Sequence, residues 1–409
     1  MNSSTQSPAN QARKIYLMET TLRDGEQAPY VNFFAPERLL IAKALADTLT
    51  EDDTLDVGFP ASSKAEFDSI ASISREVGHL HLLGLARMVE RDIDAVRESL
   101  GDHPRRRIAL IVPTSDSHRQ FKLGITQEEL VTRAVTSLRY ARRFFDYVEV
   151  GFEDATRSRR EFIFELATRL IAEGATCVCL PDTIGCATPE EYGDLFAAMR
   201  SQVPNIGNLE YLEAHCHNDL GLALANCLAA LRNGANMAGT AFNGIGERAG
   251  NTSTEELLMV MRTKPEAYPN VNTDRYAYHK IAECSALVER CSGLKVQAHK
   301  AIVGANCYRH ESGIHQDGLL KAPALYQAFG PDVIGATVEQ IVIGKHSGVN
   351  GMRQCLQRLG IAADATQAAE VLRAVKERLA TKRSVDDDEI LALAHASGLQ
   401  AAAVPDMAA

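Results

Sequence analysis

The sequence predicts a closed (β/α)₈ barrel, the TIM-barrel architecture, followed by a mainly helical C-terminal region. Three observations support this prediction. The chain has 409 residues, enough for a barrel of about 250 residues and an appended region. Eight short apolar runs alternate with helix-length stretches from residue 15 onward, and this strict alternation stops after about residue 265. An open doubly wound sheet is the structural alternative, but no G-x-G-x-x-G motif follows the first run.

Each predicted strand is rich in aliphatic or β-branched residues and is bounded by Gly, Pro or Asp. Two of the helices expected after these strands show sequence patterns that are typical of a helix N-terminus. Pro36 fits the first turn of one helix, and the sequence T-S-T-E at 252–255 fits a capping box before the last barrel helix. The strands are expected at 15–21, 54–59, 80–86, 107–114, 147–152, 175–182, 211–218 and 236–243.

Four segments are expected along the chain. Residues 1–12 are polar and form a disordered tail, and residues 13–270 form the TIM-barrel catalytic domain. Residues 271–360 mix helix and loop in a C-terminal subdomain. Residues 361–409 form an Ala-rich helical subdomain and tail, without a regulatory domain.

Composition limits the possible functions. A hydrophobic content of 45% and a charged content of 23% are ordinary for a globular protein. The formal net charge of -10 argues against nucleic acid or an anionic membrane as the main partner. No apolar run reaches the ~20 residues that a membrane span needs, and the N-terminus lacks the apolar core of a secretory signal. Nine cysteines without a C-x-x-C pair fit free thiols in a reducing cytoplasm.

Polar residues gather where the predicted strands end, which is where TIM barrels carry their active sites. One such cluster could arise by chance, but five together predict a site at this end of the barrel. The clusters are residues 19–27 after the first strand, Glu149 and Glu153 on the fifth, Asp182 and Thr183 on the sixth, residues 215–219 on the seventh, and residues 243–251 after the eighth.

His215 and His217 form the most specific pair among these residues. Residues i and i+2 of a strand point to the same face, so both imidazoles can bind one ion at the barrel mouth. A pair of satisfied buried histidines is the simpler explanation of an isolated H-x-H. Here Asp24 and Asn251 offer a carboxylate and an amide from neighbouring strand ends. Such a mixed set with open positions suits Mn²⁺, Mg²⁺, Co²⁺ or catalytic Zn²⁺.

Other polar residues at the strand ends have two interpretations each. Arg23 could form a plain salt bridge, or it could stabilise an oxyanion beside the metal. Thr183 could cap a strand, or it could hold a substrate carboxylate. Glu153 and Glu247 could accept a hydrogen bond from the second nitrogen of a metal-binding histidine.

Five segments in the same order resemble the family of α-isopropylmalate, citramalate and homocitrate synthases, which are TIM-barrel metalloenzymes related to the HMG-CoA lyases. The resemblance covers residues 14–395. Each motif alone is weak, whereas five in order are specific. They are E-T-T-L-R-D-G-E-Q-A at 19–28, H-C-H-N-D-L-G-L-A-L-A-N at 215–226, N-G-I-G-E-R-A-G-N at 243–251, H-E-S-G-I-H-Q-D-G at 310–318 and I-G-K-H-S-G at 343–348.

The resemblance implies an acyltransferase of amino-acid biosynthesis. Such an enzyme performs a Claisen condensation of acetyl-CoA with a 2-oxo acid and then hydrolyses the thioester, giving a 2-substituted malate. The first expectation is a 2-isopropylmalate synthase-like enzyme, and homocitrate, citramalate and phosphonomethylmalate synthases are alternatives. The implied cofactor is a divalent metal ion (Mn²⁺, Mg²⁺, Co²⁺ or Zn²⁺), with acetyl-CoA as co-substrate.

The resemblance also implies roles for individual residues. Arg23 is expected to bind the oxo acid and take part in catalysis, and Thr183 is expected to hold its carboxylate. His315, in the S-G-I-H-Q-D motif, is expected to reach the barrel of the other subunit in a homodimer and help to deprotonate the acetyl methyl group. Glu153 is expected to belong to the same proton relay. The implied metal ligands are Asp24, His215, His217 and Asn251.

Three departures from the family pattern bear on the substrate. Arg119 stands in the loop after the fourth strand, where isopropylmalate synthases have an apolar residue. Homocitrate synthases use an arginine of this general loop for a distal carboxylate, so Arg119 is either a substrate-binding residue or a solvated one. Phe152 alters the end of the fifth strand, and residues 334–339 lack the tyrosine that some isopropylmalate synthases carry there, although Tyr308 is nearby in sequence.

Two other functions are weighed against the synthase. HMG-CoA lyases use a cysteine in the loop after the eighth strand, and residues 244–251 contain none. A non-catalytic homologue would be expected to lose metal ligands, whereas all four are present. The 2-oxo acid remains open: 2-oxoisovalerate, pyruvate, 2-oxoglutarate and phosphono-oxo acids all fit the motifs.

Overall fold

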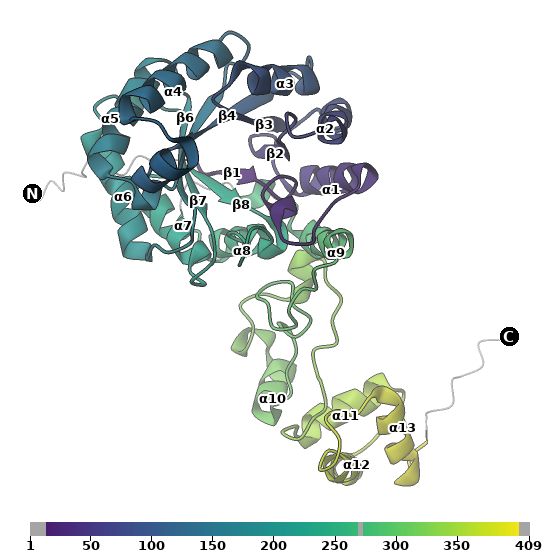
Figure 1. Cartoon of the computed structure of the whole chain (residues 1–409). Helices are drawn as coiled ribbons and strands as arrows, with labels where there is room; N and C mark the ends of the chain where they lie inside the picture. Colours follow the sequence, from purple (N-terminus) through teal and green to yellow (C-terminus); the bar gives the residue numbers. More distant parts are fainter. Residues whose placement is uncertain (1–13, 269–272, 401–409) are drawn as a thin grey trace, which may run out of the picture. The chain divides into compact units, whose positions relative to one another are not determined.

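The computed structural model describes residues 14–268 and 273–400. Its first part is a closed barrel of parallel strands in chain order, with β8 pairing back to β1 (Figure 1). The predicted fold is therefore confirmed, and each strand lies within or one residue beyond its expected range. The strands are β1 Tyr16–Glu19, β2 Thr54–Gly58, β3 His81–Arg87, β4 Arg106–Pro113, β5 Val148–Glu153, β6 Cys177–Asp182, β7 Tyr211–Cys216 and β8 Met237–Thr240.

A helix follows each strand and packs on the outside of the barrel (Figure 1). Pro36 lies in the first turn of α1, as predicted, where its missing N–H costs nothing. The barrel helices are α1 Ala35–Thr48, α2 Lys64–Glu76, α3 Glu90–Leu100, α4 Gln127–Ala141, α5 Arg160–Ala172, α6 Pro189–Gln202, α7 Ala223–Arg232 and α8 Thr254–Thr263.

The start of α8 differs from the prediction. A capping box at 252–255 is wrong, because the N-cap of the helix is Ser253 and not Thr252, and Ser253 makes no side-chain cap hydrogen bond. The neighbouring side chains are used elsewhere. The Thr254 hydroxyl donates to the buried Glu19, and Glu255 accepts a hydrogen bond from a backbone amide of the loop after β8.

Glu19 joins the first and last strands of the barrel. Its carboxyl group is fully buried and accepts hydrogen bonds from the backbone N–H of Thr21 at 2.8 Å and from the hydroxyls of Thr21, Thr254 and Thr240. Burial raises the pKa of Glu19 to about 7. This network closes the barrel and fixes the chain just before it enters the loop after β1.

The chain forms two compact units, with the boundary between Val296 and Gln297. The first unit extends beyond the expected barrel limit at residue 270, because α9 (Ile281–Ser292) packs against α1. The expected 271–360 subdomain is thus divided between the units. The tail expected at 1–12 lies outside the described residues.

The second unit is helical and has its own apolar core. It contains α10 Gly313–Lys321, α11 Val349–Arg358, α12 Ala365–Arg378 and α13 Asp387–Ala396. The core is formed mainly by Met352, Leu356, Val371, Val375 and Ile390. This agrees with the mainly helical C-terminal region predicted from the sequence.

All nine cysteines are free thiols, most of them buried. Burial raises the pKa of thiols such as Cys216 well above the usual value, so they behave as small apolar groups. Among the described residues, every helix is too short or too polar to cross a bilayer.

Candidate active site

A cavity of about 480 Å³ opens at the carboxyl ends of the barrel strands. Its size suits a small organic acid together with part of a second substrate. The alternation of each strand turns every second residue toward this cavity. Eight residues that the sequence predicts for this end of the barrel line it: Arg23, Asp24, Glu149, Glu153, Thr183, His215, His217 and Glu247.

Asp24, His215 and His217 converge on one point, as the H-x-H spacing predicts. Their potential ligand atoms all lie within 4.8 Å of one another, and all three residues are buried. The Nε2 atoms of His215 and His217 lie 2.9 and 3.9 Å from Asp24 Oδ2. Asn251 is not part of the cavity wall, but its backbone pairs with that of His217.

Unpartnered polar atoms show that this group fits a cation. His217 Nδ1 and Asn251 Oδ1 are buried and have no hydrogen-bond partner within the described part of the chain, whereas Asp24 Oδ2 is paired with Arg23 and His215. The Asn251 amide nitrogen donates to the carbonyl of Ile245, so its oxygen faces away from that bond as a free acceptor. Buried acceptors without donors are unfavourable unless an ion or a ligand compensates for them.

The electrostatics of the group also suit a metal. Burial opposes the charge of Asp24, but Arg23 and His215 outweigh burial and hold its pKa well below the usual range. Burial, reinforced by His215, lowers the pKa of His217 to about 4. The site therefore presents a carboxylate and a neutral imidazole, which are the protonation states that bind divalent ions.

Arg23 is held in place by two carboxylates. Its Nε lies 2.6 Å from Asp56 Oδ2, and its Nη1 lies 3.2 Å from Asp24 Oδ2. Asp56, on β2, is almost completely buried and also lines the cavity. The guanidinium thus has a fixed position beside the candidate metal group, as stabilisation of a developing oxyanion requires.

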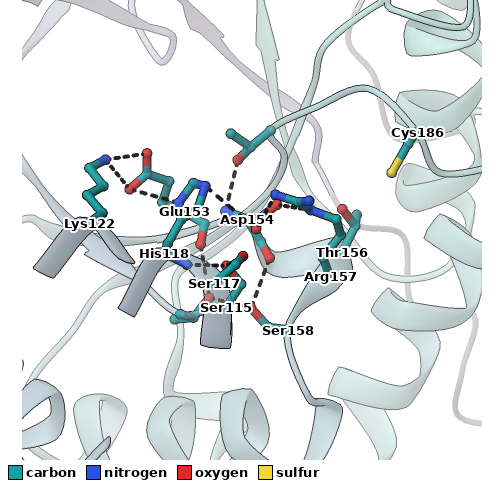
Figure 2. A network of polar contacts seen from close by, with 12 residues as sticks. Ser115, Ser117, His118, Lys122, Glu153, Asp154, Thr156, Arg157, Ser158 and Cys186 are labelled. Atoms are coloured by element: carbon teal, nitrogen blue, oxygen red, sulfur yellow. Dashed lines mark hydrogen bonds and ion pairs between the residues drawn. The ribbon is translucent and has the colours of Figure 1, made fainter. Parts of the chain in front are cut away.

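Glu153 stands at the rim of the cavity inside a polar network (Figure 2). Both of its carboxylate oxygens accept hydrogen bonds from Lys122 Nζ at 2.8 Å. His118 lies beside the same carboxylate, with 3.6 Å between Nδ1 and Oε2, and its other nitrogen lies 3.8 Å from Asp154. Figure 2 shows His118 and Lys122 pointing toward Glu153 from the turn His118–Leu123 after β4.

Thr183 and Arg248 connect three loops at the mouth of the barrel through hydrogen bonds. The Thr183 hydroxyl accepts a hydrogen bond from the backbone N–H of Asp154 at 2.8 Å, so its own hydrogen is available to an acceptor in the cavity. Arg248 makes two hydrogen bonds to Asp219 and one to the carbonyl of Thr183. Both Thr183 and Arg248 line the cavity.

Arg119 does not reach the cavity. It is absent from the cavity wall, and its side chain is only 13% exposed. Its guanidinium contacts Asp116 at 2.9 Å and the carbonyl of Ile125 at 3.0 Å within its own loop. The expectation that Arg119 binds a distal anionic group therefore has no support, because its hydrogen bonds serve the loop.

His315 belongs to the second unit, near the start of α10. Its ring stacks on Tyr326, with centroids 4.3 Å apart, and lies 6.0 Å from the ring of His310. Tyr326 follows the short helix Pro323–Leu325, and the sequence analysis did not single it out as a contact of His315.

Asp56 and Glu213 are site residues that the sequence did not single out. Asp56 holds Arg23, and Glu213 lines the floor of the cavity one inward-facing step below His215. Both lie inside strands, where a buried polar residue gives no local signal of its partner. The alternation of buried positions around a strand-end histidine is the signal that could have indicated Glu213.

The fold and the site together define a TIM-barrel protein whose barrel mouth carries a group of side chains that could hold a metal ion. The chain belongs to the HMGL-like family, whose model matches residues 14–288. Residues 302–383 match a second model, described as homocitrate synthase post-HMGL domain-like. The two matches correspond to the barrel and to most of the helical unit.

Curated relatives extend over nearly the whole chain. A 2-isopropylmalate synthase of Bacillus velezensis is 41% identical over 381 residues, covering 93% of this chain and 73% of the relative. A 2-isopropylmalate synthase of Rhodopirellula baltica is 41% identical over 399 residues, covering 96% of this chain and 74% of the relative.

Solved structures match the barrel. The hydroxymethylglutaryl-CoA lyase of Pseudomonas aeruginosa aligns with a TM-score of 0.59 at 22% identity, covering 70% of this chain and 96% of the lyase. The HMG-CoA lyase of Bacillus subtilis aligns with the same score at 17% identity, covering 70% and 97%. At this identity the structures support the fold alone.

Proposed function

We propose that this protein is an acyltransferase of the 2-isopropylmalate synthase type, which condenses acetyl-CoA with a 2-oxo acid. The observation that carries the proposal is the convergence of Asp24, His215 and His217 in the mouth of the barrel, with unpartnered buried atoms on His217 and on the neighbouring Asn251. Two relatives with 41% identity are named 2-isopropylmalate synthases, and both alignments cover more than nine-tenths of this chain.

The reaction balances as a condensation followed by a hydrolysis. The acetyl methyl carbon loses a proton and forms a carbon–carbon bond with the carbonyl carbon of the oxo acid, whose oxygen becomes a hydroxyl. Water then cleaves the thioester, which releases the CoA thiol and a 2-substituted malate. The nine free thiols suit a reducing compartment such as the cytoplasm.

Asp24, His215, His217 and Asn251 would hold a divalent ion such as Mn²⁺, Mg²⁺, Co²⁺ or Zn²⁺. When bound, the ion supplies Lewis-acid polarisation of the oxo acid's carbonyl group. Arg23 is fixed by Asp56 and stabilises the negative charge that develops on the carbonyl oxygen. The Thr183 hydroxyl donates to the carboxylate of the oxo acid.

Proton transfer is assigned to Glu153 and His315. Glu153 lies in the cavity wall, and both of its carboxylate oxygens accept hydrogen bonds from Lys122. A carboxylate at this place could accept a proton from a substrate. His315 is stacked on Tyr326 in the helical unit, and we propose that it acts on the barrel of a second subunit in a homodimer. Homocitrate and phosphonomethylmalate synthesis receive less support, because Arg119 is used within its own loop.

Thiol release tests the proposed function. Purified protein with Mn²⁺ and acetyl-CoA should release CoA when 2-oxoisovalerate, pyruvate or another 2-oxo acid is added, and mass spectrometry should detect the matching malate. Reactions without the oxo acid give the background of simple thioester hydrolysis. Absence of oxo-acid-dependent release across the panel would contradict the assignment.

A further inference from the structure

The floor of the cavity is polar on one side. Glu149 on β5, Cys179 on β6 and Glu213 on β7 come from three neighbouring strands, and Cys179 is in register with Glu213. Their side-chain oxygen and sulfur atoms lie within 4.8 Å of one another. Glu149 and Glu213 are only 6% and 2% exposed, yet both line the cavity.

The wall beside Glu149 is apolar. Leu83 and Leu85 on β3, with Ala109 and Ile111 on β4, line this wall, and Ala109 is in register with Glu149. A bound molecule that fills the cavity therefore meets hydrocarbon next to two carboxyl groups. A substrate with a purely aliphatic side chain would pack against the apolar wall but would offer no hydrogen bond to the two carboxyl groups.

The two glutamates retain capacity to accept hydrogen bonds. The Tyr147 hydroxyl lies 3.4 Å from Glu149 Oε2, and the Cys177 thiol lies 4.0 Å from Glu213 Oε2. Both contacts are long, and a thiol is a weak donor. The two carboxyl groups also hydrogen-bond each other, so the pair supplies one donor internally, and its remaining oxygens can accept hydrogen bonds from a ligand.

Among the described residues that line the cavity, no arginine or lysine side chain is left unpaired to bind an anionic group at the far end of a substrate. Each arginine among the described cavity-lining residues already faces a carboxylate, and the wall contains no lysine. A distal carboxylate or phosphonate would face two carboxyl groups and would find no unpaired cationic side chain in the wall. The arginine pairs are Arg23 with Asp56, Arg87 with Asp92, and Arg248 with Asp219.

We propose that Glu149 and Glu213 select a 2-oxo acid whose side chain ends in a hydrogen-bond donor, such as a hydroxyl group. The carbon chain of this acid lies along the apolar wall, and its donor reaches the two carboxyl groups. This inference rests on the proposed function, and it makes the glutamates determinants of specificity and not of the condensation itself.

A matched pair of substrates tests the inference. 4-Hydroxy-2-oxobutanoate and 2-oxopentanoate differ by a hydroxyl against a methyl group, and 2-oxoglutarate supplies an anionic end. Because a site built to bind a donor discriminates against analogues that lack it, kcat/KM for thiol release should be about tenfold or more higher with the hydroxy acid than with either alternative. A parent enzyme that uses 2-oxopentanoate as well as the hydroxy acid would overturn the inference.

Substitution of Glu149 provides a second test of the inference. Glu149→Leu should abolish the preference for the hydroxy acid and improve the use of 2-oxopentanoate. Glu165→Leu, on the exposed face of α5, is the control and should leave unchanged the ratio of kcat/KM for the hydroxy acid to kcat/KM for 2-oxopentanoate. If Glu149→Leu fails to fold, Glu149→Gln should still lower the ratio at least threefold. An unchanged ratio in the folded variant contradicts the inference. Absence of thiol release with every acid would instead contradict the proposed function.

Discussion

At the residue scale, the site consists of buried charges that hold one another in place. Arg23 lies between Asp56 and Asp24, and Asp24 in turn contacts His215. Each partner is nearly fully buried, so water cannot replace a lost contact without rearrangement. The position of the Arg23 guanidinium therefore depends on Asp56 as much as on its own backbone.

Asp56→Asn tests this dependence. The amide keeps the size of the side chain but removes the charge opposite Arg23, so kcat/KM should fall about thirtyfold, which corresponds to about 2 kcal/mol. Asp68→Asn, which removes an exposed partner of Lys64 on α2, serves as the control and should leave activity unchanged. Steady-state kinetics within twofold of the parent for a folded Asp56→Asn protein would show that Asp56 does not position Arg23.

At this scale, sequence patterns predict the candidate metal ligands better than they predict the residues that hold the site in place. His215 and His217 could be predicted because their spacing brings both side chains to one face. Asp56 and Glu213 could not, because their function depends on which side chain faces them across the barrel. Arg119 was given two interpretations because a sequence does not specify whether a loop arginine bonds to its own backbone.

At the element scale, the loop after β8 determines where Asn251 lies. Asn243, Gly244, Arg248 and Gly250 all have positive φ angles, between 56° and 88°. These turns bring the Asn251 backbone against His217. The glycines of the G-I-G-E-R-A-G-N motif thus allow the backbone geometry of the loop, and this geometry fixes the position of Asn251, the proposed ligand at the end of the motif.

Gly250→Ala tests the role of this loop. A Cβ at Gly250, where φ is 88°, would lie 1.8 Å from the carbonyl oxygen of Gly244, so the loop must move and Asn251 with it. Calorimetric titration with Mn²⁺ should show affinity weakened more than tenfold. Gly101→Ala is a matched control, because Gly101 also has a positive φ of 54° but nothing within 4 Å of the added atom. Equal affinity in both variants would contradict this role.

Strands were predicted more reliably than helix starts and unit boundaries. The strands combine apolar runs with polar ends, and this pattern is local. The capping box at 252–255 is wrong because the Glu255 carboxylate accepts from the backbone N–H of Asn243, and the backbone N–H of Thr252 donates to Cys216, which lies far away in the sequence. The barrel unit extends past residue 270 because α9 packs on α1, a contact between distant segments that sequence periodicity does not encode.

At the scale of the whole molecule, the proposed catalytic groups are divided between two compact units. Asp24 and its neighbours belong to the barrel, whereas His315 belongs to the helical unit with its own core. We propose that His315 serves the barrel of a second subunit, which makes a homodimer the smallest active form.

Subunit mixing tests this arrangement. His315→Ala and Asp24→Ala proteins should each be almost inactive, and a mixture should regain up to about a quarter of the parent's activity after exchange, because some mixed dimers contain one intact site. Native mass spectrometry of differently tagged chains establishes whether exchange occurs. Confirmed exchange without recovered thiol release would contradict action in trans.

The central claim is that the group formed by Asp24, His215 and His217 binds a metal that the condensation requires. The most direct test measures oxo-acid-dependent thiol release from acetyl-CoA with chelator-stripped protein, before and after addition of Mn²⁺, Mg²⁺ or Co²⁺. We predict that stripping abolishes the activity, that at least one of these ions restores it, and that His217→Ala protein stays inactive with every ion. Full activity in protein shown to be metal-free, or unchanged turnover in His217→Ala, would contradict the claim.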